Sequence, residues 1–268
     1  MIFKKIPLIE GNDNVYLEAY ISDKITDLTR DAILIIPGGG YGDVCSEREG
    51  EPIAQAFIPY GYNAFVLHYS VQSDQKVFPA QLIEASIAIK HIRDNAEEYG
   101  INSDRVFACG FSAGGHLCAS LGTMWHKDEV YGAVDMPYGY NKPTGVMLIY
   151  PVISYEFHKF SFEALLNKDS LSEEDAMRCS IDKNVDKNSS PAFIMHTATD
   201  NTVDVRNALA VAKAYADIGM PFELHIYPDA PHGVALGNKI TRCANPMYEN
   251  ESIAKWVENA VFWASYVK

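Results

Sequence analysis

The sequence predicts an α/β protein built on a doubly wound, mostly parallel sheet, and two observations carry this prediction. Short apolar runs, typical of strands covered on both faces, alternate with longer amphipathic segments of helical spacing. This alternation is the pattern of doubly wound sheets. With 268 residues, of which 48% are hydrophobic, the chain is long enough to bury a large core in a single domain, residues 1–268.

The N-terminal segments differ from the rest of the chain. Residues 2–9 and 15–21 alternate apolar and polar side chains around a turn at 11–14, which predicts an antiparallel hairpin. Buried strands are then predicted at residues 32–36, 64–69, 105–109, 146–150, 192–196 and 222–227. Helices are predicted between them at residues 51–60, 81–99, 113–124, 203–218 and 251–266.

The segment 154–190 is polar and irregular, and it predicts a small cap inserted into the sheet. Two short helices are expected in it, one near residues 162–166 and one that starts after Ser172. Ser172 is a plausible N-cap, because Asp175 follows three residues later.

Composition limits the classes of partner. The chain carries 35 acidic and 22 basic residues, a net charge of −13 that is spread along its length. Nucleic acids and anionic membranes bind basic faces, so neither is expected as a partner. Residues 1–7 lack the apolar run of a signal peptide after their lysines, and no segment approaches a membrane helix in length. A cytoplasmic protein is predicted; a homodimer is left open.

The cysteines give no sign of a metal or redox site. The five cysteines are widely spaced, and no pair has Cys-x-x-Cys spacing. Cys109 and Cys118 lie in apolar runs and are expected to be small core residues. The cysteines are at positions 45, 109, 118, 179 and 243. No metal, cofactor or disulfide is expected.

A serine at a sharp turn is the first candidate for chemistry. Gly110-Phe111-Ser112-Ala113-Gly114 follows a predicted strand and opens a predicted helix. Glycines two residues before and after Ser112 remove side chains where a strand bends directly into a helix. The hydroxyl of such a serine stands above the sheet, beside the positive end of the helix dipole. Ser112 is therefore the candidate nucleophile.

A serine hydroxyl needs a base that takes its proton, and a histidine is the usual one. His232 lies in a loop directly after the last predicted strand, and ligands in such sheets bind at the carboxyl ends of strands. His116, in the helix after the serine, is expected to point away from the site and to pack within the fold. His232 is the candidate base.

The base needs an acid that fixes its tautomer and stabilises the imidazolium. Asp200 follows the predicted strand 192–196 and is the candidate. Asp204 is the main rival, but it lies where the helix 203–218 should start and suits the helix dipole better. Asp229, near His232 in sequence, is a weaker rival.

Attack on an ester places negative charge on the carbonyl oxygen, and N–H donors that are already in position must stabilise this charge. The Gly38-Gly39-Gly40 run has no side chains and can turn its amides inward. Gly39, Gly40 and the amide of Ala113 are the candidate oxyanion hole. A glycine-rich loop can also cradle a phosphate, but the dinucleotide and P-loop patterns are not matched here.

With these residues in place, the chain from about residue 32 to 237 resembles the α/β-hydrolase superfamily. It is most similar to the small esterases labelled acetyl-xylan-esterase-like, which share an HGGG-type loop with relatives of hormone-sensitive lipase. The matching motifs are Pro37-Gly38-Gly39-Gly40-Tyr41, Arg48-Glu49-Gly50-Glu51-Pro52, His68-Tyr69-Ser70-Val71, Gly110-Phe111-Ser112-Ala113-Gly114-Gly115-His116-Leu117, Tyr150-Pro151-Val152-Ile153, His196-Thr197-Ala198 with Asp200, and Pro231-His232-Gly233.

The order serine, aspartate, histidine along the chain is also that of α/β-hydrolases. Two positions depart from the family pattern. Pro37 stands where the HGGG loop begins with histidine, and Asp204 stands near the acid where the family has proline. Neither position belongs to the expected triad.

The resemblance implies a serine carboxylesterase that acts on short acyl esters, most plausibly acetyl groups on xylo-oligosaccharide-like carbohydrates. Tyr41, Tyr69 and Tyr150 lie near strand ends and would suit a sugar-binding pocket, although they would serve equally as packing residues. The charged segment 154–190 disfavours a lipase lid and hence a triglyceride substrate.

Other functions share this scaffold. An arylformamidase has a closely similar site. A small peptidase is a further alternative, although such peptidases usually carry a large extra domain. A non-catalytic hydrolase-like protein that binds a small ligand is the alternative from a different class; such proteins usually lose a triad residue, and here all three are present.

Overall fold

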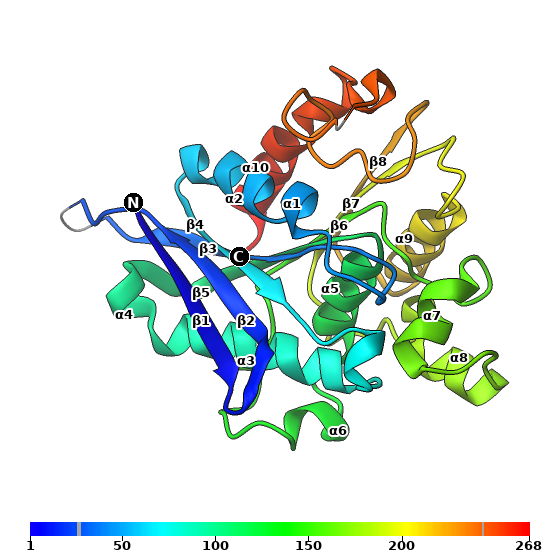
Figure 1. Cartoon of the computed structure of the whole chain (residues 1–268), viewed down its shortest axis with the longest axis horizontal. Helices are drawn as coiled ribbons and strands as arrows, with labels where there is room; N and C mark the ends of the chain where they lie inside the picture. The colour runs from blue at the N-terminus through cyan, green and yellow to red at the C-terminus, as the bar shows by residue number, and fades with distance from the viewer. Residues whose placement is uncertain (26–27, 243) are drawn as a thin grey trace.

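A computed structural model describes residues 1–25, 28–242 and 244–268, so Cys243 lies outside the described residues. In this part of the chain, eight strands form one sheet in the order β1-β2-β4-β3-β5-β6-β7-β8 (Figure 1). The strands are β1 (Ile2–Ile9), β2 (Asn12–Ile21), β3 (Arg30–Ile36), β4 (Tyr62–His68), β5 (Ile101–Phe111), β6 (Val146–Ile149), β7 (Ala192–Thr197) and β8 (Phe222–Tyr227). β1 and β2 pair antiparallel, as does β2 with β4. All pairs from β4 to β8 are parallel, which confirms the predicted α/β class.

Helices cover both faces of the sheet (Figure 1). The α-helices are α1 (Ser46–Glu49), α2 (Glu51–Phe57), α3 (Ala80–Asp94), α4 (Ala96–Tyr99), α5 (Ser112–Met124), α6 (Asp128–Tyr131), α7 (Lys159–Leu166), α8 (Glu173–Cys179), α9 (Arg206–Ile218) and α10 (Trp256–Tyr266). Buried side chains of α3, α5 and α9 form one apolar cluster with the sheet, and those of α2 and α10 form a second cluster on its other face.

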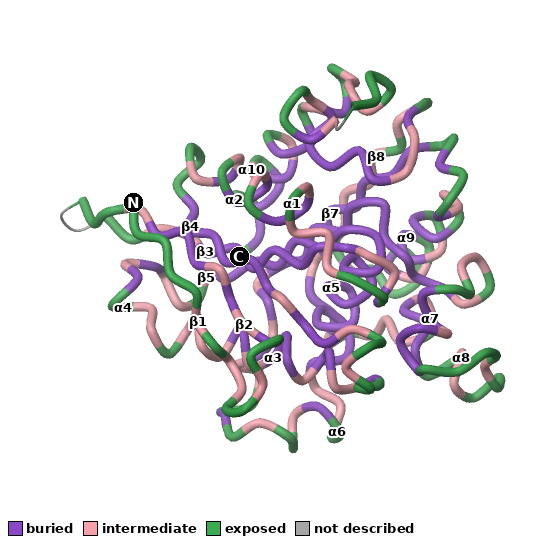
Figure 2. Tube along the Cα trace, in the orientation of Figure 1, coloured by how far each residue is buried: buried purple, intermediate pink, exposed green. Residues whose placement is uncertain are grey.

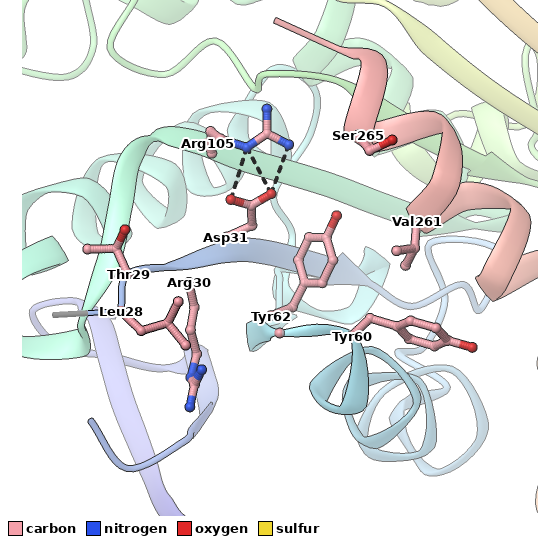
Figure 3. A pocket seen from close by; sticks show the side chains of 10 residues that line it. Leu28, Thr29, Arg30, Asp31, Tyr60, Tyr62, Arg105, Val261 and Ser265 are labelled. Atoms are coloured by element: carbon pink, nitrogen blue, oxygen red, sulfur yellow. Dashed lines mark hydrogen bonds and ion pairs between the residues drawn. The ribbon is translucent and has the colours of Figure 1, made fainter. Parts of the chain in front are cut away.

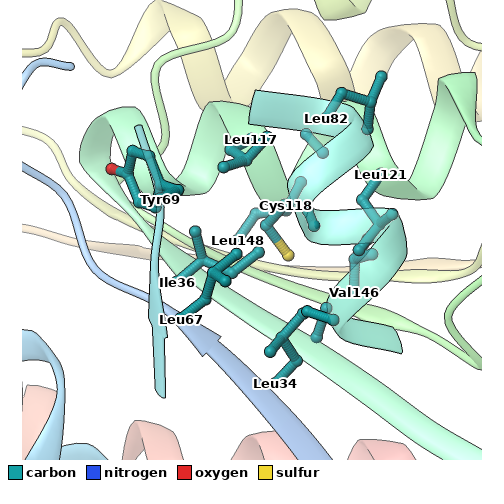
Figure 4. Packing of buried hydrophobic residues seen from close by; sticks show 14 of the residues in the cluster. Leu34, Ile36, Leu67, Tyr69, Leu82, Leu117, Cys118, Leu121, Val146 and Leu148 are labelled. Carbon is teal, nitrogen blue, oxygen red and sulfur yellow. The ribbon is translucent and has the colours of Figure 1, made fainter. Parts of the chain in front are cut away.

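Successive side chains along the central strands point to opposite faces of the sheet, and this alternation explains the two clusters. In β3, Leu34 and Ile36 face the α5 side, whereas Ile33 and Ile35 face the α10 side. All four are fully buried, so the central strands are the most buried part of the trace, whereas β1 is largely exposed (Figure 2). On the α5 side, Leu34, Leu117 and their neighbours pack tightly together (Figure 4). This packing fixes α5, and with it the start of α5, against the sheet.

Several predicted boundaries differ from the structure. The predicted helix 81–99 is broken at Asn95 into α3 and α4, because the Asn95 side chain donates to the carbonyl of His91, 2.8 Å away. The predicted helix 203–218 begins only at Arg206, and the predicted helix 251–266 becomes α10 after a short 3₁₀ turn. The strand predicted at 105–109 extends over all of β5, and α1 was not predicted.

The insertion between β6 and β7 carries the two short helices that the sequence predicts, α7 and α8. The Ser172 hydroxyl accepts from the backbone N–H of Asp175 at 3.1 Å, so the predicted N-cap is present. Among the described residues, no helix is both long and apolar enough to cross a membrane. The four described cysteines are free thiols.

Candidate active site

Ser112 lies at the junction between β5 and α5. Its backbone φ of +53° is in the left-handed region, which a serine adopts only when the surrounding structure holds it there. The flanking glycines explain how. A Cβ on Gly110 would lie 2.2 Å from the carbonyl oxygen of Gly114, and one on Gly114 would lie 2.2 Å from that of Ile36. Only glycines let the turn pack this closely, so the motif builds the strained turn that raises the Ser112 hydroxyl above the sheet.

The structure brings the three predicted residues of the triad together. His232, in the loop after β8, has its Nε2 2.9 Å from the Ser112 hydroxyl. Its Nδ1 is 2.6 Å from Oδ2 of Asp200, in the loop after β7. An ionised carboxylate can only accept, so Nδ1 carries the proton and donates it to Asp200. In the neutral ring Nε2 is then free to accept from the Ser112 hydroxyl.

Asp200 accepts three hydrogen bonds and lies close to a second histidine, His196. Its Oδ1 accepts from the backbone amides of Thr202 and Val203, both at 2.9 Å. Its Oδ2 faces His232 and also Nε2 of His196 at 3.4 Å. Burial on its own would raise the pKa of Asp200, but the hydrogen bonds from His196 and His232, the charge of His232 and the amide of Val203 together hold that pKa below its ordinary value. The carboxylate is therefore ionised and fixed in orientation.

The two rival carboxylates lie elsewhere. Asp204 accepts from the backbone N–H of Arg206 at 2.8 Å and pairs with its guanidinium at 2.7 Å, at the start of α9. This is the helix-start role that its position predicts. Asp229 accepts the hydroxyl of Thr199 at 2.7 Å, and its side chain is exposed. Neither carboxylate contacts His232.

The glycine loop after β3 lies next to Ser112. Gly39 has a φ of +127°, and a Cβ there would lie 2.1 Å from the carbonyl oxygen of Asp43. Gly40 has a φ of +65°, and both residues line the pocket that contains Ser112. Within the described part of the chain, the amides of Gly39 and Gly40 donate to no backbone acceptor. The amide of Ala113 is in the first turn of α5, where N–H groups have no partner within the helix. Among the described residues, the amides of Gly39 and Gly40 therefore lie in residues that line the pocket and have no backbone acceptor, and the amide of Ala113 directly follows the serine.

The pocket itself has a volume of about 390 Å³. Besides the predicted residues, it is lined by side chains that the sequence did not single out for a role: Arg48, Glu49, His158, Phe160 and Tyr248. Arg48 and Glu49 come from α1, and Phe160 from α7 in the cap. The family motif around Arg48 and Glu49 was the one available signal for these residues; no local pattern marked the others.

The three predicted substrate-binding tyrosines are not in this pocket, and the reason is burial. Tyr41, Tyr69 and Tyr150 are each at most 2% exposed and line none of it. The Tyr69 hydroxyl donates to the carbonyl of Pro37 at 2.7 Å, and that of Tyr150 donates to Glu49 at 2.8 Å. The structure therefore gives all three the packing role, and the expectation of direct contact with a sugar is wrong.

His116 is buried behind the site, as predicted. Its Nε2 donates to the carbonyl of Cys179 at 2.8 Å, so its Nδ1 accepts from the Tyr41 hydroxyl at 2.7 Å. Burial lowers the pKa of His116 to about 4. The neutral ring links the glycine loop to the cap segment and takes no part in the contacts around Ser112.

A second hollow lies at the opposite end of the sheet, where β3 and β4 begin (Figure 3). It has a volume of about 330 Å³. Two of its charged groups are paired with each other, since Arg105 binds Asp31 at 2.9 Å, and Arg105 also donates to the carbonyls of Ala264 and Val267. Ligands of doubly wound sheets bind at the carboxyl ends of the strands, so this hollow is not the candidate site. In the described residues, no three His, Cys, Asp or Glu side chains are arranged to hold a metal ion.

The fold, and the position of Ser112 at the end of a central parallel strand, define an α/β-hydrolase of the esterase group. Comparison with known sequences makes the assignment more specific. The BD-FAE family profile matches residues 17–215, which is more than half of the chain. The chain belongs to the BD-FAE family, and the resemblance read from its motifs is confirmed.

Individual relatives agree with this assignment. The chain is 36% identical over 222 residues to endo-1,4-beta-xylanase B of Butyrivibrio fibrisolvens, covering 79% of this chain and 34% of that protein. It is 30% identical over 212 residues to an acetylxylan esterase of Xylanibacter ruminicola, covering 77% of this chain and 41% of that protein. The chain thus spans less than half the length of these two relatives.

Similarity to a solved structure extends over nearly the whole chain. The crystal structure of an acetyl ester-xyloside bifunctional hydrolase from Caldicellulosiruptor lactoaceticus has a TM-score of 0.83 at 31% identity. The match covers 98% of this chain and 95% of that one. The chain therefore groups with ester-hydrolysing enzymes.

Proposed function

We propose that the protein is a serine carboxylesterase that removes short acyl groups, in particular acetyl groups, from xylo-oligosaccharide-like carbohydrates. The observation that carries this proposal is the continuous hydrogen-bonded chain from Ser112 through His232 to Asp200, beside unpaired amides of the glycine loop. This is the arrangement that acyl transfer through a covalent serine ester requires.

In acylation, the Ser112 oxygen attacks the ester carbonyl carbon while Nε2 of His232 takes the hydroxyl proton. The negative charge on the carbonyl oxygen is stabilised by the amides of Gly39, Gly40 and Ala113. Collapse of this intermediate breaks the bond to the alcohol oxygen. That oxygen receives the proton from His232 and leaves as the free alcohol.

In deacylation, a water molecule takes the place of the alcohol. His232 accepts a proton from the water as its oxygen bonds to the acyl carbon, and the bond to Ser112 then breaks. The proton returns to the serine oxygen, and the carboxylic acid leaves. Asp200 keeps the proton on Nδ1 throughout and stabilises the imidazolium that forms twice in each cycle. In this scheme, His232 accepts and returns every proton that is transferred.

The substrate class rests on two supports. The relatives named above include an acetylxylan esterase and an acetyl ester-xyloside hydrolase. The walls of the pocket also carry polar groups, those of Arg48, Glu49 and His158, beside the aromatic side chains of Phe160 and Tyr248. These polar groups can hydrogen-bond the hydroxyls of a carbohydrate alcohol.

The test is hydrolysis of 4-nitrophenyl esters from acetate to decanoate by the wild type and by Ser112→Ala. A preference for acetate that Ser112→Ala abolishes, at an unchanged melting temperature, is expected. Release of acetate from acetylated xylo-oligosaccharides then tests the alcohol portion. Turnover that persists in the pure Ser112→Ala protein would end the serine mechanism. No turnover and no fluorophosphonate labelling of the wild type would favour the non-catalytic alternative.

A further inference from the structure

Glu49 is a buried carboxyl group in the wall of the pocket that the proposed reaction does not use. It ends α1, its residue is 5% exposed, and it lines the same pocket as Ser112. Burial raises the pKa of Glu49, while hydrogen bonds from Gly38 and Tyr150 oppose that rise. Burying a carboxyl costs stability, so its place beside the nucleophile calls for a reason other than packing.

One oxygen of Glu49 holds the glycine loop. The backbone N–H of Gly38 donates to Oε2 at 2.7 Å, immediately before the two amides of the candidate oxyanion hole. Gly38 is closely packed at this contact, because an added Cβ would lie 2.9 Å from that oxygen and 2.9 Å from the Cβ of Ser112. The orientation of the loop relative to the serine therefore depends on where this carboxyl sits.

The other oxygen of Glu49 connects to the loop that carries the base. Tyr150 donates its hydroxyl to Oε1 at 2.8 Å and accepts from the backbone N–H of Ala235 at 3.1 Å. Ala235 follows His232 by three residues, and the Tyr150 ring lies 5.1 Å from the His232 ring, at an angle of 70°. Tyr150 has a left-handed φ of +38°, a strained conformation for a tyrosine, which turns its ring beneath the base.

Arg48, which precedes Glu49 in α1, also connects this helix to the loop of His232. Arg48 donates from its guanidinium to the carbonyl of Gly233, next to His232, and stacks 4.8 Å over the ring of Tyr248. Two consecutive residues of α1 therefore connect to the loop of the base, Arg48 directly and Glu49 through Tyr150, while Glu49 also holds the glycine loop. No other part of the proposed mechanism accounts for this arrangement.

We propose that Glu49 is a positioning residue, which holds the glycine loop and the His232 loop in register on either side of Ser112. This role rests on the proposed esterase function, because it matters only if an oxyanion forms between the two loops. Glu49 touches no reacting atom. It acts through Gly38 on one side and through Tyr150 on the other.

The test is Glu49→Gln, which keeps the shape of the side chain but replaces one acceptor with a donor. Either the Gly38 amide or the Tyr150 hydroxyl then loses its acceptor. Displacing the oxyanion donors lowers kcat for 4-nitrophenyl acetate by about 10- to 100-fold. KM is expected to stay within about twofold, since ground-state contacts are unchanged. Glu47→Gln is the matched control, because Glu47 is an exposed glutamate of the same helix, and it is expected to behave as the wild type.

Two further variants separate positioning from a general loss of structure. Tyr150→Phe breaks the link from its other end, and the double variant is expected to lose no more kcat than the worse single variant, because both remove one coupled unit. Glu49→Asp keeps a carboxylate and is expected to recover part of the kcat lost in Glu49→Gln. All values are expressed per active site, titrated to completion with a fluorophosphonate, so that unfolded protein does not count.

The outcomes distinguish this proposal from the proposed function. If neither the wild type nor Glu47→Gln hydrolyses any ester, the esterase function itself is wrong. If both hydrolyse esters, and Glu49→Gln and Tyr150→Phe keep the wild-type kcat per titrated site, Glu49 supports only the fold and the positioning role is wrong. If Glu49→Gln raises KM and leaves kcat unchanged, the positioning role is also wrong, because such a change would indicate that Glu49 contacts the substrate.

Discussion

Replacement of Asp200 by asparagine is the most direct probe of the proposed charge arrangement. In the structure, Oδ1 accepts two backbone amides, and Oδ2 faces His196 and His232. An asparagine must place its oxygen towards the two amides, because they can only donate. Its NH₂ group then points at Nδ1 of His232, which must give up its proton and accept.

The consequence for catalysis follows from the tautomer. With Nδ1 as an acceptor, the ring proton moves to Nε2, which faces the Ser112 hydroxyl at 2.9 Å and can no longer take its proton. The same change in a serine protease triad lowers kcat by about 10⁴-fold, and the loss expected here is of this order. At 1.36 kcal/mol for each factor of ten, this corresponds to about 5 kcal/mol of transition-state stabilisation.

The assay is kcat for 4-nitrophenyl acetate, with Asp204→Asn as the matched control. Asp204 is a carboxylate four residues away that pairs with Arg206 at the start of α9, so the control is expected to stay within about threefold of the wild type, as for a surface change. Thermal unfolding of each variant checks that it is folded. If Asp200→Asn kept kcat within tenfold of the wild type, or Asp204→Asn lost it instead, the assignment of the acid would be refuted.

Two further predictions concern the glycine loop and acid stability. Gly39→Ala places a Cβ 2.1 Å from the carbonyl oxygen of Asp43, at a residue with a φ of +127°, so the glycine loop must move. We expect kcat for 4-nitrophenyl acetate to fall by about 10²-fold. Gly61→Ala is the control and should leave kcat unchanged, because no atom lies within 4 Å of the added Cβ. The pKa of Asp200 is lower in the folded state, so its contribution to stability is complete above the unfolded pKa of about 3.9 and is lost as the pH falls below it. Between pH 7 and pH 3, the free energy of unfolding in urea should therefore fall less in Asp200→Asn than in the wild type. An equal fall in both proteins would show that Asp200 is not the source of this loss of stability.

Much of the fold follows from local pattern. The apolar runs identify the central strands because strands covered on both faces have no polar side, and the glycines around Ser112 identify the turn because no other residue fits there. Each residue of the proposed triad was singled out for the same reason: it lies in the loop or turn after a predicted strand, and parallel strands bring their carboxyl ends together. Boundaries were less accurate where a side chain competes with the helix, as at Asn95.

The walls of the site could not be predicted in this way. Glu49 and Phe160 meet in one pocket although more than a hundred residues separate them; only the family motif around Glu49 marks that residue, and nothing in the sequence marks Phe160. Tyr150 was correctly placed at a strand end, but its side-chain direction depends on a left-handed backbone conformation that no pattern reveals. Tyr41 also has a left-handed backbone conformation, and all three tyrosines expected in a substrate pocket are buried instead.

The sequence by itself pointed to the residues of the proposed chemistry: a serine at a sharp turn, a histidine and an aspartate after successive strands, and a glycine-rich loop. Short-range sterics and hydrogen bonding dictate each of these features. Only the tertiary structure decided the insertion of β4 between β2 and β3, the burial of the tyrosines, and the hydrogen bonds of Glu49 to the glycine loop and to Tyr150. These depend on which distant segments pack together, and that is settled by the burial of apolar surface over the whole chain.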